Sequence, residues 1–315
     1  MSFPLFCRPG SVVFVDDDRA YLEMLAEVIP EEWDAHFFSS PLRFISTLKE
    51  QISPWEEDAW KHQNIVNAWH QGQLLIPQIL EYWRDDGHQR YGFTQVCVVD
   101  YSMPGMSGLK ALHEIRGWKG ARVLLTGRAD EFLGISAFNR GLIDKFIPKQ
   151  SSELHIRLPR EISSLQAVPQ PWLNVVWQST LSRKQRDSLN LQEVQSDLQN
   201  LIQQQGWVEY IVIGSPFGML AIDASGDATW LQLKIAGPGI KPHEAHETLA
   251  RYKLRNRDRQ ATAGAQPRSP QSEPFPLGDG ALRASLFPLD ATQSPGKSAS
   301  LDAYRAKLSN REILD

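Results

Sequence analysis

Short apolar runs alternate with segments of helical apolar spacing over the first half of the chain. Apolar runs of this length are typical of strands buried on both faces of a parallel sheet. Five such strands are predicted, at residues 12–15, 35–39, 96–99, 122–125 and 143–147. Because helical patterns lie between the strands, we expect crossover units and an α/β fold with a doubly wound five-stranded parallel sheet.

Polar residues follow the last apolar residue of four of these strands. Asp16 and Asp17 follow the first strand, Asp100 the third, Thr126 the fourth, and Lys149 lies just beyond the fifth. Since the carboxyl ends of parallel strands share one edge of the sheet, these side chains are expected to converge there. Three neighbouring carboxylates require a hard cation, which favours Mg²⁺. A carboxylate beside a metal ion and a lysine can accept a phosphoryl group as an aspartyl phosphate.

The segment 98–108, VVDYSMPGMSG, carries a family resemblance. Residues 11–150 resemble the flavodoxin-like receiver domain of bacterial two-component response regulators, and this segment matches the family's phosphoacceptor motif. The resemblance implies that Asp100 accepts a phosphoryl group from a partner histidine kinase. It also implies that Mg²⁺ is held by Asp16, Asp17, Asp100 and the backbone carbonyl of Ser102. Taken alone, Asp17 and Asp18 would also fit a simple cap of the following helix.

The same resemblance implies roles for three residues of the fourth and fifth strands. Thr126 matches the family's switch hydroxyl, Phe146 its switch aromatic, and Lys149 the lysine that pairs with the phosphoryl group. The sequence departs from the family in having Gln150 where proline usually follows the lysine. The assignment of Lys149 does not depend on that position.

A second departure is the long spacing between Asp17 and Asp100, which places an insertion at about 51–92 within a receiver domain of residues 1–168. Tryptophans and aliphatic residues at helical spacing predict one or two amphipathic helices in the insertion. Two interpretations remain open. The helices either pack their apolar face on the domain or form a docking surface for a second copy of the chain or a cognate kinase.

Residues 169–260 are predicted to form a small α+β module with an antiparallel sheet. Helices are expected at 172–181 and 189–204, strands at 210–213, 219–223 and 229–235, and a last helix at 243–259. No established catalytic motif occurs in this module. The remaining residues, 261–315, are rich in Pro, Gly, Ser and Ala, so we expect a mostly disordered tail.

Two hypotheses concern the output. The module and the insertion could regulate a protein partner, or the basic run 251–259 could contact nucleic acid. Because no motif for turnover of an external substrate is present, we expect a signalling protein and not an enzyme.

Composition narrows the class of protein. Hydrophobic residues make up 42% of the chain and the formal net charge is −4, which excludes a fibrous or wholly disordered protein and gives no general attraction to nucleic acid or anionic lipid. Two cysteines suit a reducing compartment. No apolar run is long enough for a membrane span, and no secretory signal is expected at the start. A cytoplasmic location is therefore predicted.

Overall fold

The computed structural model describes residues 2–85, 87, 89–127, 131–150, 152–166, 171–235, 274–308 and 313–315. The chain forms two compact units, and each contains one six-stranded sheet. The parallel unit consists of Arg8–Asn64, His88–Pro171 and Asp302–Asp315. The antiparallel unit consists of Met1–Cys7, Ile65–Gly87 and Trp172–Leu301.

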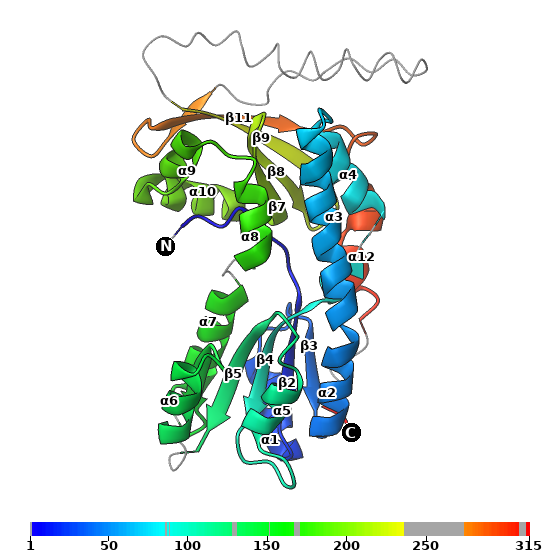
Figure 1. Ribbon diagram of the computed structural model, residues 1–315, viewed down its shortest axis with the longest axis vertical. Helices are drawn as coiled ribbons and strands as arrows, with labels where there is room; N and C mark the ends of the chain where they lie inside the picture. Colours follow the sequence, from blue (N-terminus) through cyan, green and yellow to red (C-terminus); the bar gives the residue numbers. More distant parts are fainter. Residues whose placement is uncertain are drawn as a thin grey trace. The chain divides into compact units, whose positions relative to one another are not determined.

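The sheet of the parallel unit has the strand order β12-β3-β2-β4-β5-β6, and every pair of neighbouring strands runs parallel (Figure 1). Its strands are β2 (Ser11–Val15), β3 (Ala35–Phe38), β4 (Thr94–Asp100), β5 (Ala121–Thr126), β6 (Lys145–Pro148) and β12 (Ile313–Leu314). Each central strand contains an apolar run, and every residue of β2 is buried, as a strand covered on both faces requires. The five predicted strands are confirmed.

Helices cover both faces of this sheet. Leucines of α1 (Arg19–Val28) and α7 (Leu154–Gln166) join the core formed by alternate residues of β2, β4 and β5. The other face is covered by α2 (Pro41–Glu50), α5 (Gly108–Glu114) and α6 (Glu131–Asn139). The doubly wound arrangement expected from the sequence is therefore confirmed.

The sixth strand of this sheet, β12, corrects the expectation of five strands. Ile313 and Leu314 pair in parallel with Phe37 and Phe38 of β3. Beyond the strand, the Asp315 carboxylate accepts hydrogen bonds from Ser39 Oγ at 2.8 Å and from Arg19 Nη1 at 3.3 Å. A two-residue strand carries no readable periodicity, so its pairing depends on contacts with the distant edge of β3.

The predicted insertion is divided between the two units. Helix α3 (Ile52–His70) begins in the parallel unit and ends in the antiparallel unit, which also contains α4 (Leu75–Asp85). Apolar residues of the later part, including Leu75, Ile79 and Trp83, are completely buried in the core of the antiparallel unit. One or two helices were predicted from spacing, and the structure has two. The buried face of α4 belongs to the core of the antiparallel unit and not to that of the parallel unit, so these side chains offer no docking surface.

The antiparallel unit has the strand order β1-β7-β8-β9-β11-β10 (Figure 1). Three of its strands, β7 (Trp207–Gly214), β8 (Phe217–Asp223) and β9 (Ala228–Ile235), confirm the predicted antiparallel sheet. Helices α8 (Pro171–Gln178), α9 (Arg183–Leu189) and α10 (Gln192–Gln205) precede them, and Gly206 ends α10 with a positive φ of 65°. An unpredicted edge strand, β1 (Phe6–Cys7), pairs with β7.

The expectation of a disordered tail at 261–315 is corrected for residues 274–308. Strand β11 (Leu282–Pro288) pairs along its whole length with β9, and β10 (Phe275–Leu277) pairs with β11. Leu277, Leu282 and Ala284 are buried, so a segment of Pro- and Ser-rich composition still supplies apolar side chains to the core. A 3₁₀ turn, η3 (Gly296–Ala299), and α12 (Leu301–Arg305) follow.

Candidate functional site

Three carboxylates lie together at the carboxyl edge of the parallel sheet. Val15 of β2 pairs with Val99 of β4, so Asp16 and Asp100 are neighbours at the strand ends. Asp16 is 1% exposed and Asp100 3% exposed, whereas Asp17 is exposed to solvent. One oxygen from each of Asp16, Asp17 and Asp100 lies within 4.8 Å of the other two. The structure thus brings together the acidic residues predicted from the sequence.

Lys149 completes this group. Strand β6 ends at Pro148, and the Lys149 amide donates a hydrogen bond to the carbonyl of Thr126 at 2.9 Å, which fixes the backbone beside the end of β5. Its Nζ lies 2.6 Å from Asp16 Oδ2 and 2.8 Å from Asp100 Oδ1. The ammonium group therefore bridges the two buried carboxylates.

Backbone amides position the remaining carboxylate oxygens. The Ser102 amide donates to Asp100 Oδ2 at 3.2 Å, and the Asp18 amide donates to Asp16 Oδ1 at 3.0 Å. The Asp18 side chain caps α1 by accepting from the Tyr21 amide. The capping interpretation is therefore correct for Asp18, while Asp17 stays free of that role. That the Ser102 carbonyl binds a metal stays a prediction.

The turn after Asp100 has a conformation that its glycines permit. Gly105 has a φ of +76°, a region that other residues seldom occupy. The Gly108 amide donates to the Tyr101 carbonyl at 2.9 Å, and a Cβ on Gly108 would lie only 2.1 Å from the Asp100 carbonyl oxygen. Ser107 caps α5. The motif that resembled the phosphoacceptor segment is thus built to pack closely against Asp100.

Thr126 and Phe146 lie on the neighbouring strands β5 and β6. Thr126 is completely buried, and its hydroxyl has no hydrogen-bond partner among the described residues. Phe146 is half-buried and would be the nearest contact of a Cβ on Gly134 of α6. An unpartnered buried hydroxyl costs free energy, so Thr126 Oγ1 is available as a donor to a bound group.

The electrostatics of the group are unbalanced. Burial raises the pKa of Asp16 above its ordinary value, although Lys149 lowers it in part. Burial lowers the pKa of Lys149, but its contacts with Asp100 and Asp16 outweigh this effect and raise the pKa overall. The group contains three carboxyl groups and one ammonium group, which pairs with two of them, so an oxygen-seeking divalent cation fits the excess negative charge.

Tyr21 also belongs to this group, although its place in the sequence did not predict it. Lys149 Nζ lies 4.5 Å from the centroid of the Tyr21 ring. Burial, followed by the charges of Asp16 and Asp100, raises the pKa of Tyr21 above its ordinary value. The only sequence signal was its place one turn after Asp18, where its apolar ring counted toward the helical pattern.

A buried polar cluster in the same unit was also missed. Arg8 donates from both terminal nitrogens to the Asp58 carboxylate, at 3.2 and 3.0 Å, and the buried His62 lies 3.9 Å from it. Burial lowers the pKa of His62 to about 4, Asp58 raises it in part, and Arg8 and Lys61 lower it further. These residues join the chain before β2 to α3 and do not belong to the acidic edge.

Two further expectations concern the basic run and membrane-spanning segments. The basic run 251–259 and the helix predicted at 243–259 fall in the part of the chain that the structure leaves undescribed. Among the described helices, none combines the length and apolar character that a membrane span requires.

The comparisons with known proteins agree with this architecture. A solved structure of the Legionella pneumophila response regulator LqsR matches with a TM-score of 0.69 and 21% identity, and the match covers the whole of both chains. A receiver domain protein from Clostridium thermocellum (16% identity, TM-score 0.34) and a receiver domain from Methanospirillum hungatei (16% identity, TM-score 0.32) each cover half of this chain and 94% of their own. No protein-family model and no curated protein matches the sequence. The first of these matches shows that the chain shares the fold of the Legionella protein, and its parallel unit has the flavodoxin-like arrangement expected from the sequence.

Proposed function

We propose that the protein is a two-component response regulator in which Asp100 accepts a phosphoryl group from a sensor histidine kinase. The observation that carries the proposal is the bridge from Lys149 Nζ to Asp16 and Asp100, with Asp17 within reach of the same point. Burying like charges side by side costs free energy. A site that binds a cation and a phosphoryl group accounts for carboxylates arranged in this way, because those ligands interact with them.

Each side chain has a place in the transfer. An oxygen of Asp100 attacks the phosphorus, the bond from phosphorus to the kinase histidine breaks, and the histidine nitrogen leaves with the electron pair. Asp16, Asp17 and Asp100, with the Ser102 carbonyl, would hold Mg²⁺, which supplies neutralisation of charge on the phosphoryl oxygens. Lys149 would then pair with one phosphoryl oxygen and the Thr126 hydroxyl would donate to another.

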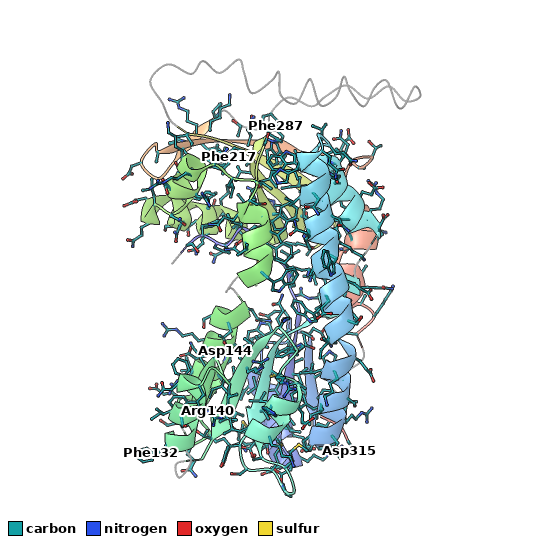
Figure 2. All side chains as sticks on the ribbon, viewed as in Figure 1. Phe132, Arg140, Asp144, Phe217, Phe287 and Asp315 are labelled. Atoms are coloured by element: carbon teal, nitrogen blue, oxygen red, sulfur yellow. The ribbon has the colours of Figure 1, made fainter. Side chains whose placement is uncertain are left out.

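Phosphorylation adds roughly −1.5 to −2 charges to the edge at neutral pH. Movement of Thr126 toward the phosphoryl group would free space for Phe146, whose ring neighbours Gly134 of α6. Helix α6 presents three large exposed hydrophobic residues on its surface, Phe132, Ile135 and Phe138, with exposed fractions of 86%, 45% and 51% (Figure 2 labels Phe132). This surface is where we expect a protein partner, or a second copy of the chain, to detect the change.

The protein would act as a signalling component and not as an enzyme with an external substrate, because the acceptor carboxylate belongs to the chain itself. Both cysteines, Cys7 and Cys97, are free, which suits a cytoplasmic location.

The proposal is tested with a small phosphodonor such as acetyl phosphate in the presence of Mg²⁺. The wild-type protein is expected to gain the mass of one phosphoryl group, and hydroxylamine should remove it because an acyl phosphate is labile. Asp100→Asn should gain none, whereas Asp187→Asn, a matched change at an exposed aspartate of α9, should behave as wild type. Labelling that persists undiminished in Asp100→Asn would refute the assignment.

A further inference from the structure

Tyr21 occupies a defined place beside the acidic edge. It lies in the first turn of α1, where its amide donates to the Asp18 side chain at 3.2 Å. Lys149 Nζ lies 4.5 Å from the centroid of its ring. An ammonium group at this distance from an aromatic face is attracted by the ring quadrupole. The cap fixes the start of the helix that carries Tyr21, and the ring lies against the same ammonium group that pairs with Asp16 and Asp100.

The hydroxyl of Tyr21 is a second feature of the same side chain. It is buried, and no described residue provides a hydrogen-bond partner for it. The charges of both Asp16 and Asp100 act on this hydroxyl. An unpartnered buried phenol is unfavourable, and it shares this property with the Thr126 hydroxyl in the same unit. Tyr21 thus brings an unused donor to the lysine that pairs with Asp100, and an anionic group bound on Asp100 would supply its missing partner.

We propose that Tyr21 is a positioning residue of the phosphoryl site: its ring orients Lys149, and its hydroxyl donates a hydrogen bond to a phosphoryl oxygen on Asp100. This inference rests on the proposed function. It adds the Tyr21 hydroxyl, on α1, to the two donors already proposed, the Thr126 hydroxyl and the Lys149 ammonium group.

Tyr21→Phe separates the two contributions because it keeps the ring and removes the hydroxyl. The measurement is calorimetric titration of the full chain with beryllofluoride in the presence of Mg²⁺, with thermal unfolding of each variant in the absence of both. Loss of a hydrogen bond to a charged group should weaken beryllofluoride binding roughly tenfold. The unliganded variant should be as stable as wild type or more stable, because no partner is lost. Tyr21→Leu, which also removes the ring, should bind more weakly still.

Tyr304→Phe is the matched control. Tyr304 Oη donates to Asp34 Oδ2 at 2.6 Å, before β3 and therefore at the opposite edge of the same sheet. This variant should lose thermal stability and keep wild-type beryllofluoride affinity, the reverse of Tyr21→Phe.

The outcomes separate the inference from the proposed function. If the wild type binds beryllofluoride, Asp100→Asn does not, and Tyr21→Phe binds as tightly as wild type, the role of Tyr21 is overturned and the phosphoryl site stands. A Tyr21→Phe variant that loses only stability would likewise show a purely structural residue. If the wild type itself does not bind beryllofluoride, both proposals fail.

Discussion

In the parallel unit, two buried carboxylates share one ammonium group at an edge of the sheet, whereas in the antiparallel unit the buried carboxylate of Glu209 accepts a hydrogen bond from an indole. Trp83 Nε1 donates to Glu209 Oε1 at 3.0 Å, and both residues are completely buried. Asp16 and Asp100 instead lie close enough to repel each other, with Lys149 between them. Both arrangements bury carboxylates. In the parallel unit two of them lie around one cation, whereas in the antiparallel unit one accepts a hydrogen bond from an indole N–H.

This contrast shows which buried polar groups are structural. Glu209 lies on β7 within the apolar core of its unit and joins that strand to α4. The hydrogen bond from the indole therefore belongs to the packing of this unit. The carboxylates of Asp16 and Asp100 repel each other, and the exposed Asp17 adds a third acidic group beside them. Unfavourable electrostatics, rather than burial alone, therefore distinguish the candidate site at this edge of the sheet.

The largest expected effect comes from removing the shared ammonium group. Lys149→Met leaves two neighbouring carboxylates without their cation, and breaking a buried ion pair in this way costs about 3 kcal/mol or more. Chemical denaturation should show this loss, and Mg²⁺ should restore part of the stability by replacing the missing positive charge.

Lys145→Met, at the first residue of β6, is the matched control. Lys145 forms an ion pair with Glu161, and their side chains are 35% and 26% exposed. Such a pair contributes under about 1 kcal/mol. If Lys149→Met proved no less stable than Lys145→Met, the Lys149 ammonium group would not be what offsets the repulsion between Asp16 and Asp100.

The next effect concerns the buried His62, whose pKa of about 4 lies below the value of 6.5 for an ordinary histidine. Between these two values the unfolded chain binds a proton that the native state does not. The free energy of unfolding should therefore decrease as the pH falls from 6.5 to about 4, by about 3 kcal/mol in total. Asp58, Arg8 and Lys61 are the charged groups that act on His62.

Denaturation curves of wild type and His62→Gln over this pH range isolate the contribution, because carboxylates elsewhere titrate equally in both proteins. The difference between the two proteins should shrink as the pH falls, since the glutamine cannot take up a proton. Parallel pH profiles would contradict the assignment of His62 as a neutral buried group.

The acidic edge could be predicted because its residues obey a local rule. Asp16, Asp100 and Thr126 each directly follow or end an apolar strand, and parallel strands end at one edge. No distant contact had to be known. Tyr21 escaped prediction because the apolar spacing of α1 already accounted for its ring, and nothing in the sequence showed that Lys149 would lie against it.

The division into units could not be predicted, because it depends on contacts between segments that are distant in sequence. The spacing in α4 showed that one face is buried but not against which sheet, and that face packs in the antiparallel unit. Strands β1 and β12 have two residues each and therefore no period. Strand β11 pairs with β9 across a long stretch of sequence, and its Pro- and Ser-rich surroundings hid the buried Leu282 and Ala284. Long-range pairing decides such segments, and composition does not reveal it.

The smallest effect tests the hydrogen bond that defines the antiparallel unit in this comparison. Trp83→Phe removes the donor to Glu209 and leaves a buried carboxylate oxygen without it, while Trp55→Phe removes an indole N–H that has no hydrogen-bond partner among the described residues. Both tryptophans are at most 1% exposed, so the two variants lose similar apolar volume. Trp83→Phe should therefore be more destabilised than Trp55→Phe by about 2 kcal/mol, the contribution of a hydrogen bond to a charged group. Both variants should still accept a phosphoryl group from acetyl phosphate, because Glu209 and Trp83 belong to packing and not to the acidic edge.

Equal stability of the two variants would mean that the buried carboxylate in the antiparallel unit does not depend on its indole donor. The hydrogen bond from Trp83 would then not be the structural counterpart of the ion pairs in the parallel unit.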